Sequence, residues 1–257
     1  MSAAAVALPL AAAGATTAHA AEPAFRVLVF SKTTGYRHDS IPDGVAAIQK
    51  LGQEHGFAVD TTEDATRFND DDLAKYQTVV FVSTTGDPLD QQSEKDAFQR
   101  YIEHGGGYVG IHAAADSGYS WAWYGGLVGA YFWDHPSIQQ ATVNVVGQGT
   151  AATKGLPNRW TRTDEWYNYR SDPRADVRVL ATLDERTYNP VGYSGGSMGE
   201  DHPIAWCHPY DGGRSFYTGM GHTKESYADP LFLSHILGGI RMTAGAAKFN
   251  CDPDSTD

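Results

Sequence analysis

The sequence has 257 residues, of which 41% are hydrophobic and 19% charged, an ordinary composition for a globular protein. That length is enough for one large domain or two small ones, and either can bury a substantial core. The formal net charge of −12 argues against nucleic acids and anionic membranes as partners, because proteins that bind them are normally basic.

Residues 1–20 have the pattern of a secretory signal segment. The alanine-rich run over residues 3–15 is too short to span a bilayer as a mature helix. It ends in Ala18-His19-Ala20, an A-x-A cleavage site, although a basic n-region is missing. We therefore expect a secreted protein, with residues 21–257 as a single domain and no transmembrane helix.

The first half of the chain alternates strand and helix signals. Residues 25–31 form a continuous apolar run, which is typical of a strand buried on both faces. Further strands are expected at residues 58–62, 78–83 and 108–112. Helical spacing with a closing glycine predicts helices at residues 42–55 and 90–104. This order indicates βαβ units and a parallel, doubly wound sheet.

The second half is less regular. Residues 140–146 alternate like an exposed strand, and residues 178–183 are expected to form another. Residues 204–208 and 214–218 flank Asp211-Gly212-Gly213, which predicts a hairpin. A closing helix is expected at residues 230–242.

Two cysteines occur, Cys207 and Cys251. Outside the cytoplasm such a pair can form a disulfide. Spacing alone does not fix the geometry, so a disulfide and two unpaired thiols both stay open.

Reactive residues gather where the predicted strands end. Lys32, Tyr36, Arg37 and His38 follow the first strand, His112 and Asp116 follow the fourth, and His222 and Glu225 lie just past a later one. The carboxyl ends of parallel strands meet at one edge of a sheet, where ligands bind. We therefore expect His38, His112 and His222 to lie together.

Two further segments are rich in aromatic residues. WAWYGGLVGAYFWDHP, residues 121–136, contains Trp121, Trp123, Trp133 and His135. TDEWYNYR, residues 163–170, contains Asp164, Glu165, Trp166, Tyr167 and Arg170. Aromatic rings suit stacking on sugars, but any one of them can equally belong to the core.

Five segments together resemble the trehalose-utilisation, or ThuA-like, family. They are TTGYRHDSIP, GGGYVGIHAA, the DHP at Asp134 to Pro136, DEWYNY, and HPIAWCHPYDGGRSFYTGMGHT. The resemblance covers nearly all of the chain after the leader. It implies a flavodoxin-like α/β fold similar to class I glutamine amidotransferases, with a mainly parallel sheet and additional antiparallel strands in the second half.

The resemblance also bears on the chemistry of the strand–turn–helix elbow. The amidotransferases carry a cysteine nucleophile there, served by a late histidine and glutamate. In this sequence the elbow holds His112, while His222 and Glu225 resemble the late pair. Without a cysteine or serine at position 112, thioester chemistry on glutamine is excluded, and imidazole suggests proton transfer or metal binding.

The substrate that the resemblance implies is a sugar, including one oxidised to a 3-keto derivative. A carbonyl at C3, or the carboxylate of a uronate, acidifies a neighbouring proton, so the glycosidic bond can break by elimination. His112 is the candidate base or metal ligand, with His222 as its partner. Tyr167 or Glu165 is the candidate proton donor, and Lys32 and His38 would lie near the developing charge. The candidate substrate-binding residues are Tyr36, Arg37, Asp116, Trp121, Trp123, Trp133, His135, Trp166 and Arg170.

Other assignments stay open at this point. His38, His112 and His222 could ligate zinc or another divalent metal, although the sequence requires no cofactor and has no HExxH motif. The protein could instead bind a carbohydrate without catalysis, or hydrolyse it through Asp116 and Glu165. The sequence does not determine the sugar, the linkage or the oligomeric state.

Overall fold

The computed structural model of the protein describes residues 1–4 and 22–253. The predicted signal segment falls almost entirely on residues 5–21, and its cleavage site lies wholly outside the described residues. The expectations about the leader and its removal therefore stay predictions.

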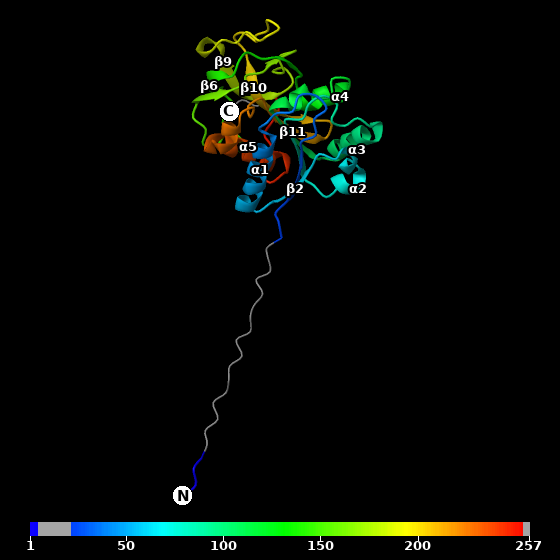
Figure 1. The fold of residues 1–257 in the computed structure, drawn as a ribbon, viewed down its shortest axis with the longest axis vertical. Helices are drawn as coiled ribbons and strands as arrows, with labels where there is room; N and C mark the ends of the chain where they lie inside the picture. Colours follow the sequence, from blue (N-terminus) through cyan, green and yellow to red (C-terminus); the bar gives the residue numbers. More distant parts are fainter. Residues whose placement is uncertain (5–21, 254–257) are drawn as a thin grey trace.

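A nine-stranded sheet forms the centre of the molecule (Figure 1). Its parallel part has the order β2 (Ala58–Thr62), β1 (Arg26–Phe30), β3 (Thr78–Val82), β4 (Gly107–Ile111) and β11 (Gly213–Thr218). Antiparallel strands extend the same sheet in the order β10 (Pro203–Tyr210), β9 (Arg178–Asp184), β6 (Gln139–Val145) and β7 (Arg159–Asp164). A separate ribbon pairs β5 (Phe132–Asp134) with β8 (Asn168–Tyr169). The predicted α/β fold is confirmed.

Helices cover both faces of the parallel part, which explains its apolar strands. Phe81 on β3 stacks on Phe98 of α3 (Gln92–Glu103) and on Tyr124 of α4 (Ala122–Val128). The next residue, Val82, faces the opposite side, where Gly44 of α1 (Ile41–His55) lies against it. The closing helix α5 (Pro230–Thr243) packs beside α1 (Figure 1). The shorter helical segments are α2 (Asp70–Leu73), η1 (Ala65–Arg67), η2 (His112–Asp116), η3 (Glu185–Thr187) and η4 (Lys224–Ala228).

The second half of the chain confirms one sequence expectation and corrects another. The predicted hairpin is present, with β10 and β11 joined by a turn at Asp211-Gly212. The strand expected at residues 140–146 is present as β6, but the expectation that it is exposed is wrong. β6 has β9 on one side and β7 on the other, and residues 141–143 are buried. Strands β5, β7 and β8 and helix α4 were not predicted.

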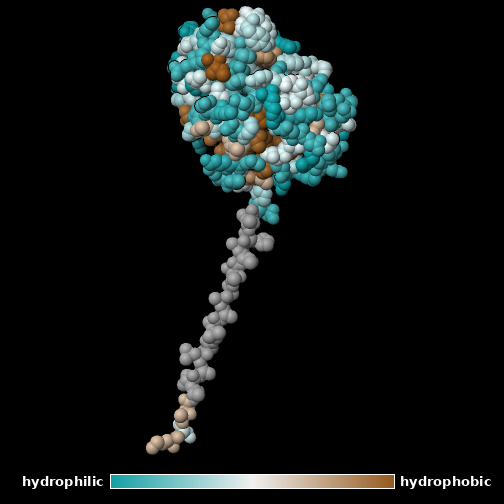
Figure 2. All heavy atoms as spheres, viewed as in Figure 1, coloured by the Kyte–Doolittle hydropathy of each residue, from teal (hydrophilic) through white to brown (hydrophobic). Residues whose placement is uncertain are grey.

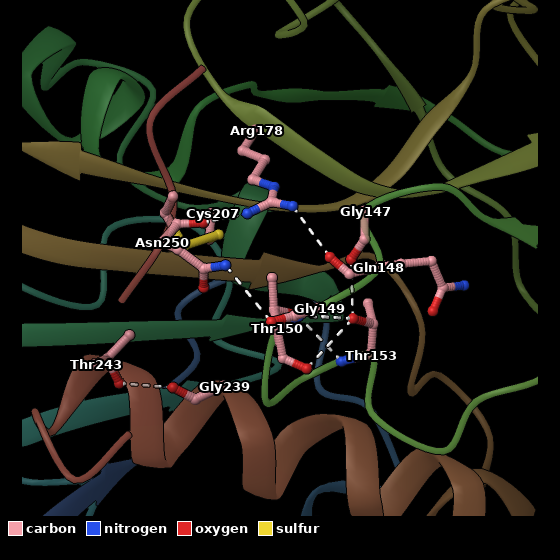
Figure 3. Close-up of a disulfide and its surroundings, with 11 residues drawn as sticks. Gly147, Gln148, Gly149, Thr150, Thr153, Arg178, Cys207, Gly239, Thr243 and Asn250 are labelled. Atoms are coloured by element: carbon pink, nitrogen blue, oxygen red, sulfur yellow. Dashed lines mark hydrogen bonds between the residues drawn. A yellow bond between two sulfur atoms is a disulfide. The ribbon is translucent and has the colours of Figure 1, made fainter. Parts of the chain in front are cut away.

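The two cysteines form a disulfide, which settles the alternative left open by their spacing. Cys207 lies on β10 and Cys251 in the C-terminal segment, with their Cα atoms 5.4 Å apart (Figure 3). Arg178 on β9 reinforces this attachment, because its guanidinium donates hydrogen bonds to the carbonyls of Asn250 (2.6 Å) and Gln148 (3.0 Å). The C-terminal segment is thereby fixed to the antiparallel half of the sheet.

The face of the molecule in Figure 2 is mainly hydrophilic, with smaller hydrophobic areas between the polar ones. That surface agrees with an excess of acidic over basic residues, 31 against 19. Within the described ranges, no helix combines the length and the hydrophobicity needed to cross a membrane.

Candidate active site

Three histidines from distant parts of the chain meet at the carboxyl ends of the parallel strands. His38 lies in the loop after β1, His112 directly follows β4, and His222 follows β11. Their ring centroids are 4.9 to 5.0 Å apart, and the rings lie nearly perpendicular to one another. The structure therefore brings together the three histidines that the strand-end pattern singled out.

His112 sits at the elbow with a left-handed backbone, at φ 50°. This conformation costs a non-glycine residue about 1–2 kcal/mol, so its surroundings must stabilise it. The Tyr217 hydroxyl donates a hydrogen bond to the His112 carbonyl at 2.8 Å. The Nδ1–H of His112 donates to the carbonyl of Gly219 at 2.9 Å, a tautomer assigned from that contact. The Nε2 lone pair consequently points toward His222, whose Nδ1 is 3.1 Å away.

A glutamate completes the cluster. Glu165 follows β7 directly, and its Oε2 lies 3.1 Å from His222 Nδ1 and 3.4 Å from His112 Nε2. Its other oxygen, Oε1, lies 3.2 Å from Nδ1 of His135. One carboxylate is thus surrounded by imidazoles from three separate loops.

Burial and mutual contacts set the charge states of the cluster. Burial raises the pKa of the Glu165 carboxyl, but the neighbouring His112 and His222 outweigh it and hold the pKa well below its usual range. Burial lowers the pKa of His222, but its hydrogen bond to Glu165 and the negative charges of Glu165, Asp164 and Asp39 together outweigh burial, so the net shift is upward. Burial, together with the two neighbouring histidines, lowers the pKa of His38 to about 2. Glu165 is therefore a carboxylate, and His38 an uncharged imidazole.

Asp164, the last residue of β7, fixes Glu165 and His222 relative to each other. Its Oδ1 accepts hydrogen bonds from the backbone N–H groups of both residues, each at 3.0 Å. Its Oδ2 accepts from Gly221 N–H at 2.9 Å and from the buried guanidinium of Arg162 at 3.0 Å. β7 and β11 are not neighbours in the sheet, so the antiparallel half must curve back for their ends to meet.

A cavity of about 380 Å³ opens above this cluster, and fully buried His112 lies beneath it. Two tyrosines at its rim, Tyr36 and Tyr193, expose 67% and 69% of their surface. Inside, burial raises the pKa of Tyr167 well above its usual value, and the nearby charges of Glu165 and Asp116 raise it further. The cavity is lined by Tyr36, His38, Asp116, Phe132, His135, Glu165, Tyr167, Tyr193 and His222.

The predicted cationic residues do not line the cavity. Lys32 lies 3.8 Å from the carboxylate of Asp90, and Arg37 forms an exposed ion pair with Glu63 at 2.6 Å. Arg170 is exposed, and its guanidinium covers the ring of Tyr119, 4.1 Å from its centroid. The expectation that Lys32 lies beside the reacting atoms is therefore wrong, and Arg37 and Arg170 have partners outside the cavity.

The four tryptophans expected to stack on a sugar also lie outside the cavity. Trp166 is fully buried, and its indole N–H donates to the Gln139 carbonyl at 2.8 Å, so no ligand reaches its face. Trp121 and Trp123 stack on each other at 5.1 Å beside Phe98 of α3, where they extend the core. Trp133 is exposed but does not line the cavity. The expectation that Trp166 stacks on a sugar is therefore wrong. The positions of the other three tryptophans give no support to such a role.

The late acidic partner also differs from the expectation. Glu225 is exposed on η4, and the carboxylate that contacts His222 is Glu165. Sequence reasoning also missed Phe132 and Tyr193 in the cavity wall and gave Asp164 no role. The sequence signal that could have indicated Tyr193 is its place in the glycine-rich segment GYSGGSMG, residues 192–199, where an aromatic side chain has little core to join.

The fold defines a flavodoxin-like α/β protein with its cavity at the carboxyl edge of the sheet. The chain belongs to the ThuA family, because the model of that family, described as trehalose utilisation, matches residues 26–243. The recognised resemblance is thereby confirmed. Among curated proteins, none matches the chain.

Solved structures agree with this family and fold. A ThuA-like protein from Bacteroides uniformis has a TM-score of 0.75 and 27% identity, over 93% of this chain and 99% of that one. A ThuA-like protein from Parabacteroides merdae has a TM-score of 0.68 and 21% identity, over 87% and 91%. The β-galactosidase from Bacillus circulans sp. alkalophilus has a TM-score of 0.56 and 13% identity, over 85% of this chain and 31% of that one, and shares the fold alone.

Proposed function

We propose that this protein is a secreted enzyme that cleaves a glycosidic bond by elimination, in a 3-keto sugar or a uronate-containing saccharide. The family description, trehalose utilisation, supports a carbohydrate substrate. The observation that carries the reaction type is the content of one cavity: a carboxyl group, a neutral tyrosine and a histidine cluster, with His112 where a nucleophile would stand. Those groups suit proton transfer and oxyanion stabilisation without a covalent intermediate.

Asp116 is the base in this proposal. Burial raises the pKa of its carboxyl, although the hydrogen bond from the Tyr119 hydroxyl (2.5 Å) opposes the shift. A raised pKa makes a carboxylate a better proton acceptor. His112, the base favoured by the sequence, is fully buried and holds its Nδ1–H against Gly219, so it reaches a substrate proton less directly.

Tyr167 is the proton donor, because its raised pKa keeps the phenol protonated. Glu165, the alternative donor, is held as a carboxylate and has no proton to give. In a 3-keto sugar, Asp116 removes the C2 proton and an enolate forms. The C1–O bond then breaks, a C1=C2 double bond forms, and the leaving oxygen takes the proton of Tyr167. Exchange with water restores both side chains, and positive charge at the histidine cluster, on an imidazolium or a bound cation, stabilises the enolate oxygen.

A substrate screen tests this reaction. The mature protein is incubated with 3-keto disaccharides and uronate oligosaccharides, and the products are followed by ultraviolet absorbance and mass spectrometry. We expect an unsaturated sugar from these substrates and none from unoxidised trehalose, which lacks the acidified proton. Saturated reducing sugars alone would indicate hydrolysis, and saturable binding without any product would indicate a carbohydrate-binding protein. Either result overturns the proposal.

Two variants test the roles. Tyr167→Phe and Asp116→Asn should each lower kcat by about 10²–10⁴-fold, the usual contribution of a general acid or base. Asp71→Asn, an exposed acidic residue at the start of α2, is the matched control and should turn over like the parent. Parental turnover in both site variants would remove these residues from the mechanism.

Secretion is supported by the leader pattern and by the Cys207–Cys251 disulfide, since disulfides persist mainly in oxidising compartments. Expression of the full chain in a secreting host should release protein into the medium or periplasm with a mature N-terminus just after Ala20. Retention in the cytoplasm with an uncleaved N-terminus would contradict secretion.

A further inference from the structure

The geometry points to a divalent transition-metal site: we propose that His112, His222 and Glu165 ligate the ion, while His38 faces the position left for water or a substrate oxygen. The four residues each offer one ligand atom, and these atoms all lie within 4.8 Å of one another. No other group of this kind occurs among residues 1–4 and 22–253. The site goes beyond the elimination reaction, because it stands whether or not a sugar is the substrate.

The spacing of three donor atoms matches a tetrahedral metal. His112 Nε2, His222 Nδ1 and Glu165 Oε2 form a triangle with sides of 3.1, 3.4 and 3.1 Å. Ligands bound tetrahedrally to Zn²⁺ at 2.0–2.1 Å stand about 3.3 Å from one another. The three atoms therefore already occupy the corners of such a site, without side-chain rearrangement.

Hydrogen bonding alone satisfies this triangle poorly. The proton of His112 is on Nδ1, where it bonds to Gly219, so Nε2 presents a lone pair. Glu165 presents a second acceptor, and only the Nδ1–H of His222 lies between the two, at 3.1 Å from each. A single N–H cannot donate a full hydrogen bond to two buried acceptors, so neither acceptor is fully satisfied. A cation at the centre contacts all three lone pairs.

The surroundings have the features of an outer shell around a metal. The Gly219 carbonyl orients His112, as backbone carbonyls commonly orient metal-bound histidines. His135 Nδ1 lies 3.2 Å from the other oxygen of Glu165, and Asp164 holds the backbones of Glu165 and His222. His38 packs edge-on against both other histidines, and its buried Nδ1 has no hydrogen-bond partner among the described residues. That ring lines the cavity, so the fourth position opens toward a ligand.

The donor set also indicates which class of ion fits. Two imidazoles and one carboxylate carry a net charge of −1, and an open fourth position is the arrangement of catalytic zinc sites. Nitrogen donors favour zinc and similar transition metals over Mg²⁺ and Ca²⁺, which prefer oxygen. Such an ion would polarise a substrate carbonyl and stabilise the enolate that elimination requires.

Metal binding is tested directly and without sugar. The chelator-stripped mature chain is titrated with Zn²⁺ by calorimetry and with Co²⁺ by visible absorption. We expect about one ion per chain, an intense four-coordinate Co²⁺ spectrum, and a rise in Tm with Zn²⁺ that Mg²⁺ does not produce. No uptake of either ion, or equal stabilisation by Mg²⁺, would overturn the proposal.

Ligand variants sharpen the test. His112→Asn, His222→Gln and Glu165→Gln should each weaken Zn²⁺ binding by about 100-fold or more, since even outer-shell changes cost 10–100-fold. The matched controls are Glu225→Gln, exposed on η4, and His104→Gln, exposed at the end of α3. Both should bind like the parent. Parental affinity in the ligand variants would place the ion elsewhere, whatever the outcome of the sugar screen.

Discussion

The two ends of the parallel strands carry very different cavities. The amino edge holds the larger one, about 520 Å³, lined by Arg100, His104 and Arg214 among others. Its charged groups are already paired: Arg100 contacts Asp70 through two hydrogen bonds of 3.0 and 3.1 Å, and Arg214 donates to two backbone carbonyls. The carboxyl edge holds about 380 Å³, with donors and acceptors that compete for partners. The candidate site is distinguished less by its volume than by polar groups whose hydrogen-bonding capacity is not fully used.

Backbone strain separates the two ends as well. At the carboxyl edge Ser83 and His112 follow adjacent strands with φ of 46° and 50°. At the amino edge the positive φ values fall on glycines such as Gly56 and Gly105 and on the turn Asp211-Gly212, where such residues adopt them readily. Strain on non-glycine residues is typical of functional sites, because the surrounding structure must maintain it.

The largest effect that would test this contrast is loss of turnover on changing the elbow. His112→Asn should lower kcat by about 10³-fold, because it removes a ligand of the proposed metal site, which would stabilise the enolate oxygen, while asparagine tolerates the left-handed backbone. Arg100→Gln, in the larger cavity, should leave kcat unchanged. Steady-state kinetics on the substrate found in the screen measures both. Equal losses in the two variants would erase the distinction between the edges.

The disulfide should affect stability alone, because it lies outside the candidate cavity. A crosslink with a sequence separation of 44 contributes about 4 kcal/mol in the chain-entropy model. The double variant Cys207→Ser/Cys251→Ser should therefore unfold at a clearly lower urea concentration and keep parental kcat at room temperature. A fall in kcat before unfolding would show that the antiparallel half also tunes the site.

Asp164→Asn should affect both stability and the site. Removing the charge leaves buried Arg162 without its closest carboxylate, which costs about 3 kcal/mol. The uncharged asparagine amide also binds the backbone N–H groups of Glu165 and His222 more weakly than the carboxylate does. These two residues should therefore move apart. We expect lower kcat and weaker Zn²⁺ binding with little change in KM. Lower stability with parental kcat and metal affinity would reduce Asp164 to a structural role.

The contrast between the edges also shows what the sequence could predict. The strands β1, β3 and β4 are apolar after their first residues because helices cover both faces, and their pattern placed His38 and His112 correctly. β7 (RWTRTD) alternates in burial, but two of its three inward residues, Arg162 and Asp164, are charged and pair with each other. No apolar periodicity marks it as a strand.

The residues that follow β7 were named as site candidates, but the directions of their side chains could not be predicted, for the same reason. Glu165, Trp166 and Tyr167 are consecutive, yet Glu165 and Tyr167 line the cavity while Trp166 points into the core. Which side chain faces the cavity and which faces the core depends on the register of β7, a strand that the sequence pattern does not indicate. Composition gave the sugar-stacking role to tryptophans, whereas the exposed rings at the cavity are tyrosines.

The smallest predicted effect concerns those tyrosines. Tyr36→Ala and Tyr193→Ala should each raise KM by about five- to tenfold with little change in kcat, since stacking contributes about 1 kcal/mol and both rings stand at the rim. Tyr193→Phe keeps the ring and should bind like the parent. Trp133→Ala removes an exposed ring that does not line the cavity and should change KM less. A larger effect at Trp133 than at Tyr193 would mean that the sugar lies across the outer surface, and that the cavity receives only its reacting end.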